Sequence, residues 1–176
     1  MSINSQLSPE AIEEIKKTRD NLHNARHLPG YFYTSNEIFR LEMDKILMRE
    51  WLCVGRVEEY EKNGDYQAFR IANEPVVVCR GQDGQIRAFR NLCQHRGVEV
   101  AVGKGNRKLF VCRYHAWSYD TLGNLKAAPH SKQVQNFDFK SCGLPKLNLG
   151  TWGGYIFINF DPNCPSLNDC LDEDGV

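Results

Sequence analysis

The sequence predicts a mainly β fold preceded by N-terminal helices, with the strands in a small antiparallel sandwich or barrel. From Trp51 onward the chain consists of short β-branched and aromatic segments separated by Gly, Asn and Asp, which is typical of strands and turns. The segments are WLCVGRV, YQAFRI, PVVVCR, IRAFRN, KLFVCR, WSYD and YIFINF. Before Trp51 the apolar residues recur at helical spacing instead. Many short strands favour a sandwich or barrel, whose loops are well placed to hold a cofactor.

Two helices are expected in the N-terminal segment. Ser8 is a good N-cap and Pro9 suits the first helical position, so the first helix begins there and reaches about Asn24. A Pro-Gly pair then breaks the chain. The stretch TSNE at 34–37 can form a capping box for a second helix, which ends near Trp51.

These patterns divide the chain into three parts. Residues 1–50 form the helical segment, residues 51–162 form the β domain, and residues 163–176 are an acidic tail or the start of a linker. Within the β domain, Gly81-Gln82-Asp83-Gly84 is expected to close a hairpin, and Leu122-Gly123-Asn124 to make another tight turn.

Composition excludes several classes of function. Lys plus Arg number 22 and Asp plus Glu number 22, so no net field draws the chain to nucleic acid or to an anionic membrane. The N-terminus has no apolar signal core, and the longest apolar run, around Tyr155 to Phe160, is too short to span a bilayer. Seven cysteines without a secretory signal favour reduced thiols, some of them binding metal. We therefore expect a soluble, cytoplasmic protein that binds neither nucleic acid nor membrane.

Four metal-ligand side chains follow the pattern C-x-H-x16-C-x2-H and are Cys93, His95, Cys112 and His115. Each pair offers one soft thiolate and one imidazole. A zinc finger also uses two Cys and two His, but it usually draws two like ligands from one turn and two from a helix. A Rieske 2Fe-2S cluster needs both cysteine and histidine ligands, because two thiolates hold one iron and two imidazoles hold the other. The pattern therefore predicts these four residues as ligands of such a cluster.

The segments CQHRG, CRYHAWSYD and TWGGYIFINFDP resemble the Rieske domain of the α subunits of Rieske non-haem iron oxygenases, the ring-hydroxylating family. The similarity extends from about Pro29 to Pro162. It implies a Rieske-type antiparallel β sandwich with a 2Fe-2S cluster-binding subdomain, in which the family's four ligands match the Cys and His residues named above. It also implies a reductase or ferredoxin as electron donor and a mononuclear non-haem iron that activates dioxygen. In the family the cluster of one subunit serves the iron of a neighbour in a ring-shaped homotrimer, and a ligand histidine contacts an acid across that interface.

Residues near the four ligands indicate which type of Rieske cluster this sequence resembles. Cytochrome-type Rieske proteins have two extra cysteines and a serine near the cluster, and these positions are held here by Val98, Tyr114 and Trp117. The resemblance thus implies the lower-potential oxygenase or ferredoxin type. Gln94 and Arg113 stand where proline is common in the family, and Ala116 replaces a common glycine. Arg113 adds a cation that can shift the potential or the docking surface.

No catalytic residue is predicted in this chain. In the family a 2-His-1-carboxylate triad holds the catalytic iron in a C-terminal domain, and His23, His27 and His130 do not occur at such a spacing. The leading hypothesis is the electron-transfer domain of an oxygenase, an oxidoreductase whose catalytic iron lies outside these residues. The alternative is a stand-alone Rieske ferredoxin, against which the two N-terminal helices argue. A structural zinc module is the third hypothesis.

The remaining histidines and cysteines have plainer interpretations. His23 and His27 are expected to cap carbonyls at a helix end or to face solvent, rather than to bind metal. His130 is expected in a loop, and by the resemblance the Pro129 segment can cover the cluster. Cys53 and Cys79 lie in apolar stretches and are expected in the core. No role is assigned to Cys142, Cys164 and Cys170.

Residues around the ligands leave two interpretations open. Tyr114, Trp117 and Tyr119 are expected to pack in the β core, although they could also shield the cluster from water. Arg96 either lies on an exposed rim and pairs with an acidic partner group or is simply solvated. Gly97 is expected to serve the tight geometry of its loop.

Overall fold

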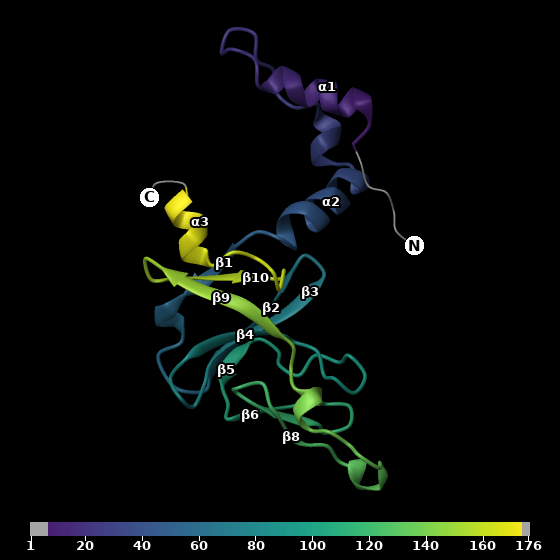
Figure 1. The fold of residues 1–176 in the computed structure, drawn as a ribbon, viewed down its shortest axis with the longest axis vertical. Coiled ribbons are helices and arrows are strands. Elements are labelled where there is room, and N and C mark those ends of the chain that lie inside the picture. The colour runs from purple at the N-terminus through teal and green to yellow at the C-terminus, as the bar shows by residue number, and fades with distance from the viewer. Residues whose placement is uncertain (1–6, 174–176) are drawn as a thin grey trace. The chain divides into compact units, whose positions relative to one another are not determined.

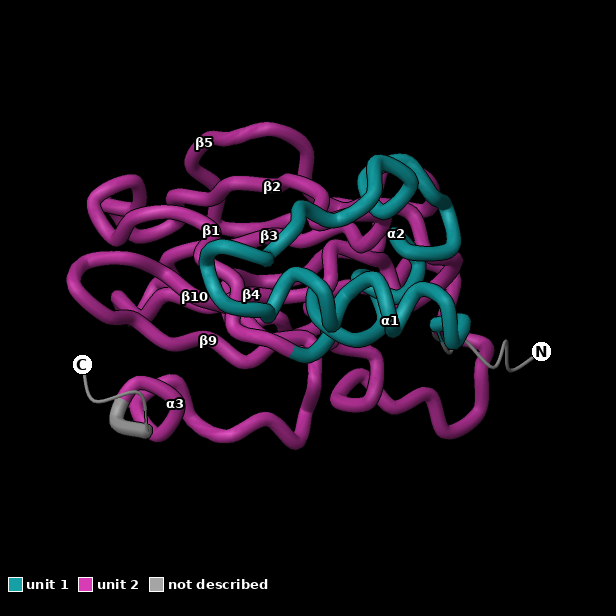
Figure 2. Tube along the Cα trace, turned by 90° about the horizontal axis from the view of Figure 1, so that it is seen from above, with its two compact units in different colours: residues 1–49 teal, residues 50–176 magenta. Residues whose placement is uncertain are grey.

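The computed structural model describes residues 7–173 and has two compact units, Met1–Arg49 and Glu50–Val176, which are described separately (Figure 2). The first unit contains α1 (Pro9–Thr18), the 3-10 helix η1 (Gly30–Tyr33), α2 (Asn36–Glu42) and the π-helical turn η2 (Met43–Leu47). Phe32 and Ala11 are its buried apolar residues among those described.

The N-terminal helices begin near the predicted positions but differ in detail. Ser8 caps α1 as predicted, since its hydroxyl accepts a hydrogen bond from the Ala11 N–H at 3.2 Å. The prediction that this helix reaches Asn24 is wrong. It ends at Thr18, and Asn21 instead starts a turn in which its side-chain oxygen accepts from the Asn24 N–H at 3.2 Å. The capping box at 34–37 is also wrong, because the N-cap of α2 is Ser35.

The second unit is built on a seven-stranded antiparallel sheet in the order β1-β10-β9-β4-β3-β2-β5 (Figure 1). Its strands are β1 (Leu52–Arg56), β2 (Asp65–Ile71), β3 (Glu74–Arg80), β4 (Ile86–Arg90), β5 (Lys104–Asn106), β9 (Lys146–Trp152) and β10 (Tyr155–Asn159). A three-stranded sheet comprises β6 (Leu109–Val111), β7 (Ser118–Asp120) and β8 (Leu125–Ala127), in the order β6-β7-β8. Short 3-10 turns are η3 (Val57–Glu59), η4 (Ser131–Gln133) and η5 (Lys140–Cys142).

The predicted antiparallel β sandwich is confirmed. All seven predicted segments contain strands, Gly81–Gly84 joins β3 to β4, and Leu122–Asn124 joins β7 to β8. Strands β5, β8 and β9 were not predicted. β5 is the three-residue polar edge strand KGN, and its pairing with β2 is what makes it a strand. β9 contains Gly150 and Asn148, which favour turns, but its residues 148–152 pair with β10.

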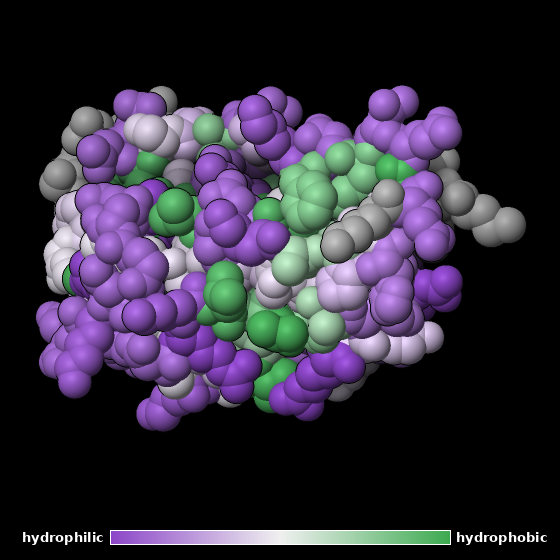
Figure 3. Space-filling view, turned by 90° about the horizontal axis from the view of Figure 1, so that it is seen from below, coloured by the Kyte–Doolittle hydropathy of each residue, from purple (hydrophilic) through white to green (hydrophobic). Residues whose placement is uncertain are grey.

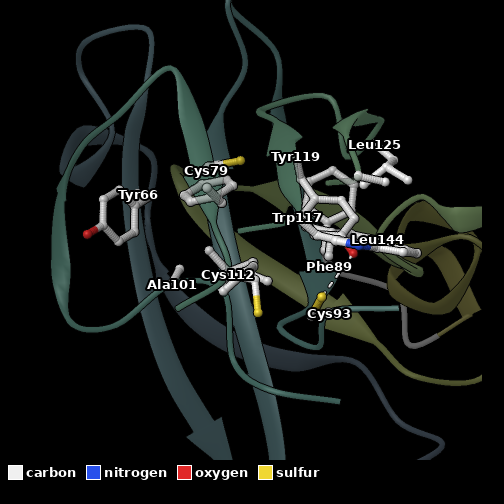
Figure 4. Close-up of a cluster of buried hydrophobic side chains, with 14 residues drawn as sticks. Tyr66, Cys79, Phe89, Cys93, Ala101, Cys112, Trp117, Tyr119, Leu125 and Leu144 are labelled. Carbon is white, nitrogen blue, oxygen red and sulfur yellow. Dashed lines mark hydrogen bonds between the residues drawn. The ribbon is translucent and has the colours of Figure 1, made fainter. Parts of the chain in front are cut away.

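One core lies between the two sheets (Figure 4). Tyr66, Val77 and Phe89 come from the large sheet, and Phe110 and Tyr119 come from the small one. The rings of Tyr66 and Phe110 meet edge to face with centroids 5.3 Å apart. The two sheets therefore pack through a shared core as the layers of a sandwich.

The C-terminal part of the described chain contains α3 (Leu167–Glu173), within the stretch 163–176 that was expected to be a tail or linker. Leu167 is buried and packs against Gly150 of β9, where a Cβ atom would lie only 2.8 Å from the Leu167 Cβ. The Trp51 indole donates to the Pro165 carbonyl at 3.1 Å. Across residues 7–173, no helix is long and apolar enough to cross a membrane.

Candidate metal centre

Two loops with nearly the same backbone carry the four predicted ligands. The first follows β4 and the second follows β6. In the first, the Cys93 N–H donates to the Val98 carbonyl at 2.9 Å, and the Gly97 N–H donates back to the Cys93 carbonyl at 2.8 Å. The second loop repeats this pattern. The Cys112 N–H donates to the carbonyl of the fifth residue after it, Trp117, at 2.8 Å, and the N–H of the fourth residue after it, Ala116, donates back to the Cys112 carbonyl at 3.0 Å. The two loops therefore present their cysteines in equivalent positions.

The fifth residue of each loop adopts a left-handed backbone conformation. Gly97 has φ +67° and Ala116 has φ +57°. Glycine reaches this region without strain, which confirms the role expected for Gly97. Alanine is disfavoured there by about 1 kcal/mol, so the Ala116 departure is a small local cost of the second loop.

Both thiols point into the core rather than to solvent. Cys93 is 2% exposed and Cys112 is 3% exposed, and neither is in a disulfide. The Cys93 Sγ lies 3.3 Å from the Tyr119 hydroxyl, which also accepts a hydrogen bond from the Gln94 N–H at 2.9 Å (Figure 4). Burial, followed by the nearby Cys112 thiol, raises the pKa of Cys93, while Tyr119 and the His95 backbone lower it. The two thiols thus form a neighbouring pair in an apolar setting.

The two imidazoles lie at the outer side of the loops. Their ring centroids are 4.6 Å apart at an interplanar angle of 69°. His95 is exposed and stacks on Trp117, with centroids 5.0 Å apart and an angle of 13°. His115 is half-buried and lies against Tyr114, with centroids 3.8 Å apart. Burial, and then the charges of His95, Arg96 and His130, lower the pKa of His115.

The first loop is held by a buried amide beneath it. Asn91 is 1% exposed, and its Oδ1 accepts from the N–H groups of Val100 and Ala101 at 3.0 and 2.9 Å. Its Nδ2 donates to the Ala101 carbonyl at 2.8 Å. Asn91 therefore fastens the chain after the loop to the end of β4. Sequence reasoning missed this residue, since an asparagine after a strand is typical of a turn.

The donor set fits a two-iron, two-sulfide group between the loops. Two buried thiols are paired, and two imidazoles are paired, as a centre with one thiolate-bound and one imidazole-bound iron requires. Among the described residues, His115 Nδ1 is the buried side-chain nitrogen or oxygen that has no hydrogen-bond partner. A buried nitrogen with a free lone pair is expensive unless a ligand occupies it, and metal coordination would satisfy it.

Several residues lie elsewhere than predicted. Tyr114 is 58% exposed, so its expected place in the β core is wrong, whereas Trp117 and Tyr119 are buried at 7% and 0%. Cys53 is exposed, because its side of β1 does not face the core, and the core prediction for it is wrong. Cys79 is confirmed as a core residue.

The other singled-out residues lie at or near the surface. His23 and His27 are exposed and lie beyond the end of α1. His130 lies in the predicted loop, close enough to His115 to affect its pKa. Three cysteines without an assigned role, Cys142, Cys164 and Cys170, are half-buried.

The fold and the site together define a class of protein, a β sandwich in which two matched loops carry paired thiols and paired imidazoles. A family model for the Rieske [2Fe-2S] domain matches residues 50–138. The chain belongs to the Rieske [2Fe-2S] domain family, whose domain binds a 2Fe-2S cluster.

Relatives of known activity are subunits of Rieske oxygenases. The carnitine monooxygenase oxygenase subunit of Escherichia coli (strain K12) is 37% identical over 168 residues, which cover 95% of this chain and 45% of that protein. The glycine betaine monooxygenase oxygenase subunit of Pseudomonas aeruginosa is 37% identical over 177 residues, which cover 97% of this chain and 41% of that protein. The chain thus spans less than half the length of these curated relatives.

Solved structures give the same result for the fold. Naphthalene 1,2-dioxygenase from Rhodococcus sp. matches 94% of this chain and 39% of its own, with a TM-score of 0.84 and 29% identity. A quaternary ammonium Rieske monooxygenase in complex with γ-butyrobetaine matches 81% of this chain and 41% of its own, with a TM-score of 0.77 and 35% identity. The sequence resemblance to Rieske oxygenase α subunits is therefore confirmed, and the chain resembles part of them.

Proposed function

We propose that Cys93 and Cys112 hold one iron of a Rieske 2Fe-2S cluster and that His95 and His115 hold the other. The observation that carries this assignment is the pair of equivalent loops, which bring two buried thiols and two imidazoles together and leave His115 Nδ1 without a partner. The bound cluster supplies reversible one-electron transfer. The chain is then the electron-transfer part of an oxidoreductase.

The surrounding residues give the centre its character. Neutral imidazoles in place of two anionic thiolates favour the reduced form and raise the potential relative to an all-cysteine centre. The Tyr119 hydroxyl accepts from the Gln94 N–H, so its own hydrogen is available to the Cys93 sulfur. Burial, and then the Cys93 thiol, raise the pKa of Tyr119, which keeps the hydroxyl protonated as a donor. Exposure of His95 leaves its outer ring nitrogen able to exchange a proton.

The whole protein is proposed to be the α subunit of a mono- or dioxygenase that works in the cytoplasm. A reductase or ferredoxin supplies the electrons, and they pass to a mononuclear non-haem iron held outside residues 1–176. A homotrimer, in which this domain serves the iron of a neighbouring subunit, is part of the proposal. Support comes from the oxygenase subunits that match nearly all of this chain along less than half of their own length.

Metal and sulfide analysis tests the ligand assignment. The purified protein is expected to contain two irons and two acid-labile sulfides per chain and to be coloured. Cys112→Ser should lose both, whereas Cys53→Ser should keep them, because Cys53 is an exposed thiol of β1. A colourless protein with zinc and no sulfide would show a structural zinc module instead.

The sequence of the gene beyond codon 176 tests the role of the whole protein. An in-frame continuation that supplies two histidines and a carboxylate at the spacing of an iron triad supports the oxygenase. A stop codon at that point would make the chain a stand-alone electron carrier.

A further inference from the structure

The His95 ring is oriented by contacts with other rings. Among the described residues, no group makes a hydrogen bond to this ring, although a histidine that binds a metal usually donates one to a neighbouring group. Its ring contacts are with His115 and Trp117, whose centroids lie 4.6 and 5.0 Å away. Trp117 is therefore the neighbour outside the four proposed ligands that can hold His95 in one orientation.

The indole of Trp117 lies nearly flat against the His95 ring. The angle between the two planes is 13°, whereas the rings of Tyr114 and His115 are tilted by 35°. Trp117 is 7% exposed, so its ring cannot move aside, while Tyr114 is 58% exposed and can swing into solvent. A buried flat ring hinders rotation of an imidazole, because turning it drives an edge into the indole face. His95 is therefore restrained by an aromatic neighbour more strongly than His115.

Trp117 connects one ligand loop to the other. It belongs to the second loop, where its carbonyl accepts from the Cys112 N–H at 2.8 Å, yet its ring lies on His95 of the first loop. The equivalent residue of the first loop is Val98, whose carbonyl accepts from the Cys93 N–H at 2.9 Å. Valine has no ring to place on a histidine. The two loops therefore match in their backbone bonds but differ in this contact, which makes one ligand depend on the loop that does not carry it.

Two phenylalanines continue the row of rings beyond Trp117. Phe137 meets the indole edge to face with centroids 5.6 Å apart, and it meets Phe139 in the same way at 5.1 Å. Phe137 is partly buried against the core that contains Trp117, whereas Phe139 is 41% exposed. Figure 3 views the molecule from the side where β6 and β8 lie in Figure 1, and it shows hydrophilic residues around a smaller hydrophobic area. Phe137 therefore supports the indole from a third segment of the chain.

We propose that Trp117 is a positioning residue that fixes the orientation of the His95 ring, and that Phe137 holds the indole in place. This rests on the proposed function, since the orientation of His95 matters only if His95 binds iron. A ring that is held in advance presents its metal-binding nitrogen in one direction and needs little rearrangement when the charge of the centre changes. His115 does not depend on Trp117 in this way, so the two histidines differ in what orients them.

A selective change at one histidine tests the proposal. The full chain is prepared with its centre and with 15N-labelled histidine, and pulsed electron paramagnetic resonance of the reduced protein measures the nitrogen coupling of each imidazole. Trp117→Leu removes the flat ring and should shift or broaden one of the two couplings, whereas Trp117→Phe keeps a flat ring and should leave both as in the wild type. Transfer of iron to a chelator should be about tenfold faster in Trp117→Leu, because losing a group that orients a metal ligand weakens metal binding by about this factor or more.

Three further variants separate orientation of the ligand from damage to the core. Phe89→Leu truncates a fully buried ring of the same core, and within residues 7–173 this ring has no ring contact with a histidine. It should lower stability and leave both couplings unchanged. Tyr114→Leu removes the ring beside His115 and should leave unchanged the coupling that responds to Trp117→Leu. Phe137→Leu removes support from the indole and should alter that same coupling to a smaller extent.

Several results would overturn this inference alone. They are unchanged couplings in Trp117→Leu, an equal shift of both couplings, the same shift in Phe89→Leu, and a response of the same coupling to Tyr114→Leu. If Trp117→Leu assembles no centre, Phe137→Leu decides, because a shift of one coupling supports the inference and two unchanged couplings contradict it. A wild-type protein without iron and sulfide would instead overturn the proposed function together with this inference.

Discussion

The hydroxyl of Tyr119 provides a precise test of the site. Tyr119 is fully buried, and its oxygen lies 3.3 Å from the Cys93 Sγ. Tyr119→Phe removes this oxygen and leaves the ring in the core. A hydrogen bond to a thiolate ligand stabilises the more negative, reduced state more than the oxidised one, so its loss should lower the reduction potential.

The size of this shift follows from the strength of the bond. A hydrogen bond to a charged group contributes about 1.5–3 kcal/mol. If about 1 kcal/mol of this distinguishes the reduced from the oxidised state, the potential falls by about 40 mV, because about 59 mV corresponds to a tenfold change for one electron. The variant also loses the acceptor of the Gln94 N–H, so a decrease in stability of about 1 kcal/mol is expected as well.

The assay is a redox titration of the purified protein followed by visible absorbance. Tyr114→Phe is the matched control, because Tyr114 lies in the second ligand loop with its side chain exposed, and among the described residues its hydroxyl makes no hydrogen bond to either thiol. It should shift the potential by less than about 10 mV. A rise in potential in Tyr119→Phe, or a shift no larger than that of the control, would refute the role assigned to the hydroxyl.

Three further predictions concern stability. Asn91→Ala should lower the free energy of unfolding, measured in urea, by about 2–4 kcal/mol, because it removes three buried hydrogen bonds. The control is Asn163→Ala at an exposed position, and an equal loss of stability in that variant would contradict the prediction. Ala116→Gly should raise that free energy by about 0.5–1 kcal/mol, since glycine relieves the positive φ, and unchanged stability would show that the loop tolerates alanine without strain. The Arg87 side chain lowers the pKa of Asp83 to about 2. The stabilisation from this ion pair is therefore fully present above the ordinary carboxyl pKa of about 3.8 and is lost as pH falls through about 2. The difference in Tm between the wild type and Asp83→Asn should shrink as the pH falls from about 3.8 to about 2.

The strands of the fold were predictable where the local sequence is apolar. The run Val76-Val77-Val78 is fully buried on both faces of the large sheet, and such a run is typical of a central strand. Strands β5 and β9 depend on pairing with β2 and β10, so their own residues gave little signal. The end of α1 was missed because the side-chain oxygens of Asp20 and Asn21 accept from the backbone N–H groups of Asn21 and Asn24, and these local bonds compete with the helix.

The site was predictable where residue type and spacing carry the chemistry. Each loop carries two of the four proposed ligands close together in sequence, and the two loops have matching backbone hydrogen bonds. The contacts that surround them were not predictable. Tyr119 reaches Cys93 across 26 residues, and Asn91 binds the chain ten residues later, so each contact exists only after the sheets pack. Exposure also depends on packing, which is why Tyr114 and Cys53 were placed wrongly in the core.

The central claim is that two cysteines and two histidines share one two-iron centre. The most direct measurement is pulsed electron paramagnetic resonance of the chemically reduced protein, prepared with 15N-labelled histidine. Two 15N couplings are expected, one from His95 and one from His115. A centre held by thiolates alone would show no coupling to labelled histidine. A reduced centre without histidine couplings, or a protein that gives no iron–sulfur signal on reduction, would contradict the account.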